Sequence, residues 1–336
     1  MERIPITGVE LRPIRDADAD GLIRLVAEAY DEHPGCVLDL PGVDDDLPTP
    51  ETTAAARGGR WWVLERDGEI LGSIGTGAVD EAGVLELKRC YLAAGLRGRG
   101  LATRLIKRVE AHAAGLGAEA IELWSDTRFT AAHHRYEALG YQRTGEQRDL
   151  HDPSETTEYR FVKTVDDAEV ACTATWDGPH GSDRAALALL PDGAVVRGEV
   201  GGMRYDLEVD AAWRPRLARL RGVRVQHTIT SDGAGRWWQD GLPVADLAGC
   251  TDAGLADSPA AVLLPTRRLG LGTGEGAAVR IVTLGDAPDG VRATTRHYHR
   301  SGARSWRIDS PEGVFDIEAA EDQLPGDLGD DWRRRD

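Results

Sequence analysis

Lysine is the scarcest charged residue of this sequence. Only Lys88, Lys107 and Lys163 occur among 40 basic residues, so arginine carries nearly all of the positive charge. The 57 acidic residues leave a formal net charge of −17 at pH 7. Proteins that bind nucleic acids or anionic membranes need a basic surface, so we expect neither partner.

Cysteine and long apolar runs are also scarce. The four cysteines, at positions 36, 90, 172 and 250, include no C-x-x-C pair. We therefore expect no zinc motif and no disulfide framework, which is typical of a reducing compartment. No run of about 18 apolar residues occurs, and residues 1–21 lack the apolar core of a secretory signal. We expect a cytoplasmic protein without a membrane span.

The patterns that are present divide the chain of 336 residues into two parts. Two domains are the usual outcome for this length. Strand and helix patterns alternate up to residue 165, whereas short alternating runs separated by Gly, Pro, Asp and Ser follow after residue 172. We predict an α+β domain over 1–165, a linker over 166–171 and a mostly-β domain over 172–336.

Each element of the first part has a recognisable pattern. Apolar residues at helical spacing predict helices over 16–30, from Gly100 onward, and over 128–140. The Asp67-Gly68 pair between two apolar runs predicts a hairpin over 60–77. Residues 33–53, rich in Pro, Asp and Thr, are expected to form a long loop. Further strands are expected over 8–14, 83–95, 118–126, 141–150 and 156–163.

The segment LRGRGLATRL, residues 96–105, follows a predicted strand and opens a predicted helix. Glycines there let a ligand approach the backbone, and the first N–H groups of a helix have no partner within the helix. A pyrophosphate therefore suits this position, while a plain Gly-rich turn is the alternative. Thr103 occupies the third glycine position of a dinucleotide fingerprint, and no Gly-Lys-Ser/Thr follows.

Residues 97–102 fit the R/Q-x-x-G-x-G/A pattern that binds coenzyme A in the GCN5-related N-acetyltransferases (GNAT). The preceding ELKRCYL is similar to the fourth strand of that family, and residues 123–141 are similar to its second signature. The resemblance extends over residues 8–163. It implies a mixed, mostly antiparallel sheet with flanking helices, acetyl-CoA as cosubstrate, and no metal.

The resemblance also implies a cofactor site. Pantetheine would lie along the fourth strand, and the pyrophosphate would sit on the N–H groups that follow it. The backbone N–H near the end of that strand, at Leu92, would stabilise the oxyanion. The implied cofactor-binding residues are Cys90, Tyr91, Leu92, Arg97, Gly98, Arg99, Gly100, Leu101, Ala102 and Thr103.

Two catalytic roles follow from the same resemblance. Tyr136 matches the family tyrosine whose phenol protonates the departing thiolate, although a tyrosine of the core is the alternative. Glu86 is the candidate base, because the attacking amine must be neutral. An ordinary ion pair of Glu86 with Lys88 or Arg89 is the alternative.

Other residues of this half have weaker assignments. Asp126 and Glu32 are further candidates for the base. Phe129 stands where many family members have Asn, which puts a side-chain contact to the cofactor in doubt. The acidic loop 30–47 hints at a cationic acceptor, and the pair His133-His134 is expected on a helix surface.

Residues 257–271, DSPAAVLLPTRRLGL, resemble a glycolipid-binding bacterial family, together with Trp213 upstream and RHYH downstream. The resemblance covers residues 172–335 and implies a curved antiparallel sheet, a half-open barrel or spiral β-roll, with a lipid or glycolipid as ligand. We expect Arg267-Arg268 in a strand, where one side chain would face an anionic head group or form a salt bridge.

Two more expectations concern the second half. His297 and His299 share one strand face, but a third metal ligand is not visible in the sequence. The charged tail 329–336 is expected to be solvated.

Two functions are compatible with the sequence. One is an N-acetyltransferase that acetylates a primary amine of a small molecule, with a second domain that binds a lipid or glycolipid. The alternative is a non-enzymatic protein that senses acyl-CoA or binds an amphiphile. The oligomeric state stays open, a homodimer included.

Overall fold

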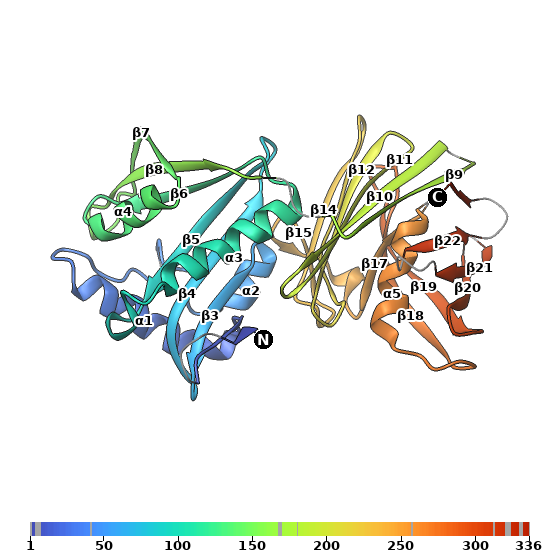
Figure 1. Ribbon diagram of the computed structural model, residues 1–336, viewed down its shortest axis with the longest axis horizontal. Coiled ribbons are helices and arrows are strands. Elements are labelled where there is room, and N and C mark those ends of the chain that lie inside the picture. Colours follow the sequence, from blue (N-terminus) through green and yellow to red (C-terminus); the bar gives the residue numbers. More distant parts are fainter. Residues whose placement is uncertain are drawn as a thin grey trace. The chain divides into compact units, whose positions relative to one another are not determined.

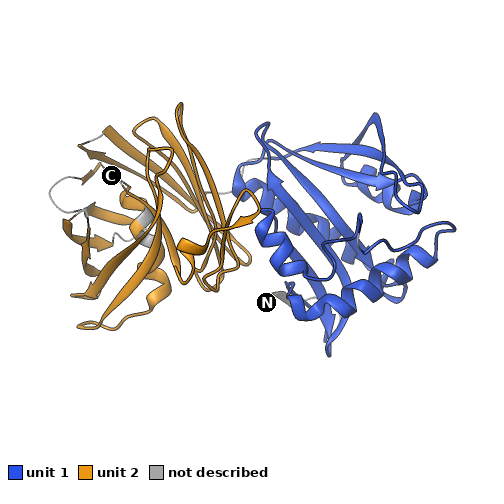
Figure 2. Cartoon of the chain, turned by 180° about the vertical axis from the view of Figure 1, so that it is seen from behind, with its two compact units in different colours: residues 1–168 blue, residues 169–336 orange. Residues whose placement is uncertain are grey.

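The computed structural model describes residues 2–3, 8–40, 42–166, 170–179, 181–256, 258–311, 313–319, 324–328 and 332–335. The chain divides into two compact units, residues 1–168 and 169–336 (Figure 2). Residues 167–169 of the predicted linker lie outside the described part. No helix in the ranges described has the length and apolarity to cross a membrane.

The first unit is built on an eight-stranded sheet of order β1-β2-β3-β4-β5-β6-β8-β7. The β5–β6 pair is parallel, and the other neighbours are antiparallel. The strands are β1 (Glu2–Arg3), β2 (Glu10–Pro13), β3 (Trp61–Arg66), β4 (Glu69–Val79), β5 (Val84–Leu92), β6 (Ala120–Asp126), β7 (Gln142–Asp149) and β8 (Thr157–Thr164).

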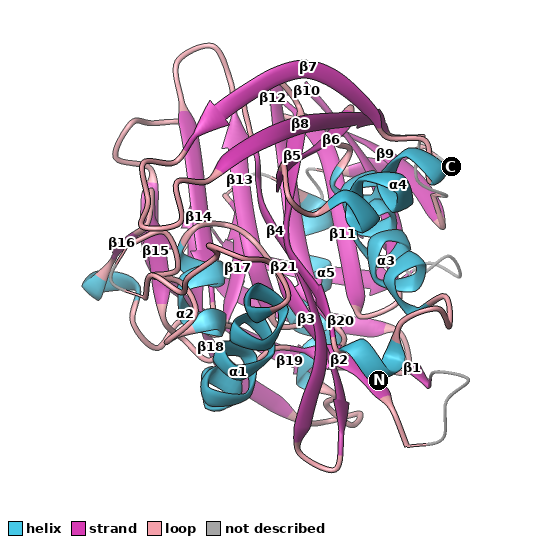
Figure 3. Cartoon of the chain, turned by 90° about the vertical axis from the view of Figure 1, so that its left-hand side faces the viewer, coloured by secondary structure: helices cyan, strands magenta, loops and turns pink. Residues whose placement is uncertain are grey.

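Helices cover both faces of this sheet (Figure 3). Along β3, Trp61 and Val63 pack with α1 and α2, whereas Trp62 and Leu64 pack with α3. This alternation is the period of two of a strand buried on both faces. The helices are η1 (Asp16–Asp18), α1 (Ala19–Asp31), α2 (Pro50–Ala56), η2 (Ala94–Leu96), α3 (Leu101–Leu116) and α4 (Thr130–Ala138).

The predicted elements of this unit are confirmed, and the short elements β1, α2 and η2 are additions. Asp67 and Gly68 both have positive φ, 51° and 84°, as the tight turn of a right-twisted hairpin requires. The expected loop over 33–53 contains the start of α2, which the pattern did not predict. Pro50 occupies the first turn of that helix, where a missing N–H carries no penalty.

The second unit contains two sheets that enclose one apolar core (Figure 1). The nine-stranded sheet has the order β16-β15-β14-β13-β12-β11-β10-β9-β23, and the six-stranded sheet has the order β17-β18-β19-β20-β21-β22. The predicted mostly-β, half-open architecture is confirmed. The first sheet comprises β9 (Cys172–Gly178), β10 (Gly181–Leu190), β11 (Gly193–Val200), β12 (Met203–Asp210), β13 (Pro215–Arg221), β14 (Gln226–Ser231), β15 (Trp237–Gln239), β16 (Leu242–Pro243) and β23 (Arg333–Arg334).

The six-stranded sheet is accompanied by short helices. Its strands are β17 (Asp252–Leu255), β18 (Gly276–Leu284), β19 (Val291–Arg300), β20 (Ser305–Ser310), β21 (Gly313–Ala319) and β22 (Pro325–Leu328). The helices of this unit are η3 (Ala245–Leu247), η4 (Pro259–Val262) and α5 (Leu263–Leu269).

Two expectations for the second unit were wrong. Arg267 and Arg268 lie in the helix α5 and not in a strand. Residues 332–335, the described part of the tail, are not merely solvated, because β23 pairs with β9 and Trp332 is 5% exposed in the core. Both outcomes depend on distant contacts that local patterns do not report.

Candidate active site

A gap opens in the first sheet between β5 and β6. The two strands pair only from Val84 opposite Ala120 to Leu87 opposite Leu123. Beyond that point β5 continues along β4, whereas β6 continues along β8. The second half of β5 therefore has a free edge toward the gap.

A β-bulge in β5 lies at this gap. Ser73 faces Tyr91 and Gly75 faces Lys88, so Arg89 and Cys90 together oppose one residue of β4. Arg89 has φ = +55°, a conformation that residues other than glycine rarely adopt and that is typical of functional sites.

The bulge is followed by an amide that points into the gap. The Ala93 N–H donates to the carbonyl of Leu71 on β4 at 2.9 Å. Because hydrogen bonding alternates along an antiparallel pair, the Leu92 N–H points away from β4, toward the side that β6 has left. The Leu92 carbonyl accepts a bond from Arg97 Nε on that side, at 3.1 Å.

A cavity of about 280 Å³ lies between this edge of β5 and the start of α3. Gly98 and Gly100 line it with φ of 75° and 79°, and a Cβ on either would meet nothing within 4 Å. The first N–H groups of α3 are free of helical partners and carry the positive end of its dipole. The predicted cofactor residues that line this cavity are Cys90, Tyr91, Leu92, Arg97, Gly98, Gly100, Leu101, Ala102 and Thr103.

The predicted pyrophosphate cradle comprises residues 97–103. Its two arginines bring less positive charge to the cavity than the sequence suggests. The Arg97 guanidinium forms an ion pair with Glu32, and Arg99 is exposed and does not line the cavity. The hydrogen bond from Arg97 lowers the pKa of Glu32. Glu32 lines neither this cavity nor the adjoining one between β5, β6 and the β7–β8 hairpin, so its position does not suit a base.

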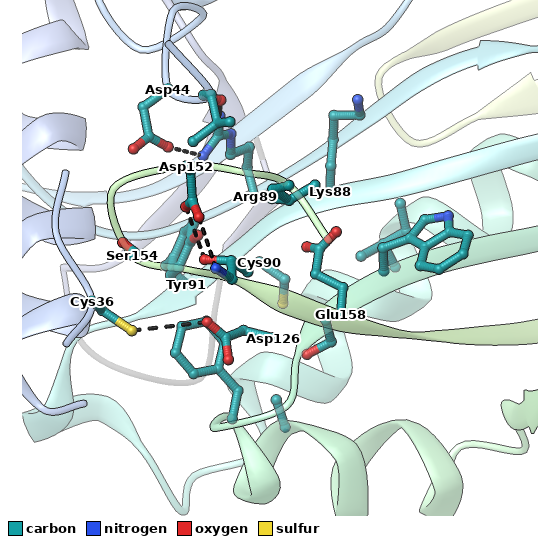
Figure 4. Close-up of a pocket in the computed structure, with 18 of the residues that line it drawn as sticks. Cys36, Asp44, Lys88, Arg89, Cys90, Tyr91, Asp126, Asp152, Ser154 and Glu158 are labelled. Atoms are coloured by element: carbon teal, nitrogen blue, oxygen red, sulfur yellow. Dashed lines mark hydrogen bonds and ion pairs between the residues drawn. The ribbon is translucent and has the colours of Figure 1, made fainter. Parts of the chain in front are cut away.

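A second cavity of about 370 Å³ (Figure 4) shares part of its lining with the first. It is lined by the loop after α1, by β5 and β6, and by the β7–β8 hairpin. The residues shared by the two cavities are Cys90, Tyr91, Phe129, Ala132 and Tyr136. This arrangement can hold a thioester in the first cavity, the cofactor cavity, and its acceptor in the second, the acceptor cavity.

Tyr136 lies at the junction of the two cavities. It is 6% exposed, and its hydroxyl lies close to the Cys90 thiol. Burial raises the pKa of Tyr136 well above its ordinary value and raises the pKa of Cys90 to about 11. At neutral pH the phenol therefore keeps its proton and the thiol is not a nucleophile.

Glu86 faces the acceptor cavity in an ion pair with Lys88, 2.8 Å from its Nζ. Asp126, the second candidate base in this cavity, accepts bonds from Arg128. Glu158 on β8 was not predicted. Burial raises its pKa, and it points into the same cavity (Figure 4).

The loop after α1 is tied to the bulge. The Arg89 guanidinium donates to Asp44 at 2.6 Å, to Asp46 at 2.7 Å and to the Val43 carbonyl at 2.8 Å. Because Arg89 binds both of these buried carboxylates and cancels half of their charge, they argue less for a cationic acceptor than the sequence suggests.

Aromatic residues close the cavities at α4. Phe129 replaces the family Asn with a ring that lies 4.6 Å from His33 and 6.3 Å from Tyr30, measured between centroids. His133 is 8% exposed, contrary to the expected surface position, and its Nε2 bonds to the Asp126 carbonyl at 3.0 Å. Burial lowers the pKa of His133.

In the second unit the predicted residues have structural contacts. Arg268 forms an ion pair with the fully buried Asp252 at 2.6 Å, and Arg267 lies over Trp213 at 5.2 Å. His297 and His299 are exposed on β19. Within the described ranges no three His, Cys, Asp or Glu side chains are arranged to hold a metal ion.

Two family models match this chain. Residues 24–141 match the "Acetyltransferase (GNAT) family", and residues 185–334 match the family described as "Putative glycolipid-binding". The chain joins a GNAT acetyltransferase domain to a domain of the glycolipid-binding family. The first match supports an acyltransferase enzyme, and both resemblances of the sequence are confirmed.

Two curated relatives are similar to part of the chain. The N-acetylaspartate synthetase of Danio rerio is 31% identical over 99 residues, which are 30% of this chain and 35% of the relative. The Rattus norvegicus N-acetylaspartate synthetase is 33% identical over 88 residues, which are 26% and 29% of the two chains. The chain thus spans about a third of the length of these relatives.

Solved structures are similar to one part of the chain at a time. A DUF1089 family protein from Pseudomonas aeruginosa is 27% identical, with 46% of this chain and 92% of that chain covered and a TM-score of 0.41. An N-acetyltransferase from Thermoplasma acidophilum, solved in complex with coenzyme A, is 14% identical, with 46% and 98% covered and a TM-score of 0.37.

Proposed function

We propose that the protein is an N-acetyltransferase that moves an acetyl group from acetyl-CoA to a primary amine of a small molecule. The observation that carries this proposal is the meeting of two cavities at Cys90 and Tyr136, beside the gap between β5 and β6. A direct transfer needs a thioester and an amine that approach each other from opposite sides, and this junction provides both approaches.

The residues of the cradle hold the cosubstrate in this proposal. The N–H groups from Arg97 to Thr103 bind the pyrophosphate, and the edge of β5 at Cys90, Tyr91 and Leu92 pairs with pantetheine. The Leu92 N–H is oriented toward the gap, where it stabilises the oxyanion as the amine attacks. Removing one such donor typically slows a reaction about 10²–10³-fold.

Proton transfers complete the reaction. The new N–C bond forms as the C–S bond breaks, Tyr136 gives its proton to the thiolate, and Glu86 accepts a proton from the amine through water. Tyr136 suits the role of acid because its raised pKa keeps it protonated. Glu86 suits the role of base because it lines the acceptor cavity, although Lys88 must move as the amine enters.

A binding experiment with a matched control tests the cradle. In Ala102→Glu a carboxylate would enter the cofactor cavity at the first turn of α3, where an acidic residue does not disturb the helix. The control is Gly95→Glu, which adds the same group to open space in η2, shortly before α3 and outside that cavity. We expect calorimetry to show micromolar binding of acetyl-CoA to the wild type and to the control, but not to Ala102→Glu.

The outcomes separate the two functions. Binding that Ala102→Glu abolishes, together with thiol release on addition of amines, supports the enzyme. Binding without thiol release for any amine favours the acyl-CoA sensor. No binding to the wild type overturns both.

We further propose that the second unit binds a lipid or glycolipid and that the protein works in the cytoplasm. The family match supports the first statement, and the four free cysteines agree with a reducing compartment. Extraction of the purified full chain with organic solvent, followed by mass spectrometry, tests for a bound lipid. A homodimer is testable by light scattering of the same sample.

A further inference from the structure

Arg148 stands out among the cations that line the acceptor cavity. It lies on β7 directly opposite Glu158 on β8, and its side chain is 42% exposed. Its Nε donates to Glu158 at 2.6 Å, and its guanidinium carbon lies 4.4 Å from the centroid of the Trp124 ring. These two contacts fix the plane of the guanidinium.

The terminal nitrogens of Arg148 remain available. Its Nη2 lies 3.9 Å from a Glu86 oxygen, beyond hydrogen-bond distance, and neither Nη atom makes a hydrogen bond to the described residues. Arg89 differs, because Asp44, Asp46 and the Val43 carbonyl occupy its guanidinium. Arg148 is therefore held in place while its outer donors stay open.

A guanidinium with a fixed plane is well suited to a carboxylate. Its two outer N–H donors match the two oxygens of a carboxylate, and a restrained side chain loses little entropy on binding. The stacking on Trp124 restricts this side chain further.

The surrounding charges indicate what the rest of the acceptor carries. Glu86 and Glu158 lie on either side of Arg148, and Lys88 pairs with Glu86, so these four side chains cancel in formal charge. A ligand with one ammonium and one carboxylate leaves this balance unchanged. The complete charged lining of the cavity has six carboxylates and four cations, and this formal charge of −2 favours the ammonium of such a ligand.

We propose that Arg148 binds the carboxylate of the acceptor and that the acceptor is an amino acid whose amino group is acetylated. This inference rests on the proposed N-acetyltransferase function. Arg148 determines specificity by anchoring the carboxylate, whereas the amino group extends toward the junction at Tyr136.

Matched pairs of acceptors test the inference. Each pair joins an amino acid to the amine that lacks its carboxylate: serine with ethanolamine, phenylalanine with phenethylamine, and lysine with cadaverine. Thiol release from acetyl-CoA by the full chain is measured for each. We expect at least one amino acid to be a substrate, with a kcat/KM at least about 10-fold above that of its partner amine.

Two variants separate substrate binding from structure. Arg148→Lys keeps a positive charge beside Glu158 but removes the fork, so KM for the amino acid should rise about 10- to 100-fold. KM for the partner amine should not change. The control Arg160→Lys alters an arginine on the same hairpin that pairs with Glu122 and Glu146 and does not line the cavity. It should leave both constants unchanged.

The failures are distinguishable. If acetyl-CoA binds and the amines without a carboxylate are used as well as their amino acids, the inference is overturned and the N-acetyltransferase remains. Equal effects of Arg148→Lys on both members of a pair also overturn it, because they indicate a structural role. Absence of thiol release with every acceptor overturns the inference together with the proposed function.

Discussion

Replacing Tyr136 with Phe removes one oxygen from the junction of the two cavities. The ring contacts with Tyr141 and Phe161, both at 5.9 Å between centroids, keep their shape. The Cys90 thiol loses a polar neighbour, which costs at most about 1 kcal/mol of stability. The fold should therefore survive, and the effect on the reaction can be measured.

The expected loss of rate follows from the role of the phenol. General acids contribute about 10²–10⁴-fold, so the barrier should rise by about 3–5 kcal/mol. Affinity for acetyl-CoA should stay within about twofold, because the cradle itself is unchanged. Thiol release at saturating acetyl-CoA and calorimetry measure the two quantities separately.

Tyr141→Phe is the matched control. Tyr141 is 2% exposed and belongs to the same aromatic cluster, but it lines neither of the two cavities. Its hydroxyl is buried and has no hydrogen-bond partner among the described residues. Rates that fall equally in both variants, or that stay at the wild-type level in Tyr136→Phe, would refute the assignment of the acid.

The pH profile gives an independent check. Because the pKa of Tyr136 lies well above 10, the donor stays protonated below that value. The wild-type rate should rise with pH as the amine loses its proton, and it should not decline before about pH 9. A decline near neutrality would point to a different acid.

Three further predictions concern stability, measured by chemical denaturation of the full chain. Arg89→Gln leaves two buried carboxylates without their cation and should cost about 3–5 kcal/mol and raise KM for the amine, whereas Arg57→Gln, at an exposed pair, should cost less than about 1 kcal/mol. Burial raises the pKa of Asp183 to about 6. The stability that its protonated carboxyl contributes to the fold is therefore complete below about pH 4 and is lost as pH rises through about 6. The free energy of unfolding of Asp183→Asn, relative to that of the wild type, should therefore rise by up to about 3 kcal/mol between pH 4 and pH 7.5. A difference between the two proteins that does not change with pH would contradict this reasoning. Trp332→Ala should cost about 3–5 kcal/mol because it empties a core position, and the fully exposed Val223→Ala should cost nothing measurable.

The sequence by itself determined the folds of the two domains and the helix start that we propose as the cofactor cradle. The cradle depends on residues 97–103, which are consecutive, and on the free N–H groups at the start of a helix. The alternation of apolar residues in β3 and the Asp67-Gly68 turn are equally local. Such features need no distant partner, so their patterns in the chain are sufficient to predict them.

Tertiary structure decided the acceptor cavity. The bulge at Arg89 is held by carboxylates more than 40 positions earlier, and Arg148 faces the cavity only because β7 pairs with β8 beside Trp124. The alternate polar positions Glu122 and Asp126 on β6 and Glu158 and Arg160 on β8 were a signal for an exposed face, but they did not show which face borders the gap. Likewise the helix α5 and the buried Trp332 depend on packing against strands far away in the sequence. Contacts of this kind depend on which segments meet in space, and one sequence read along its length does not contain that information.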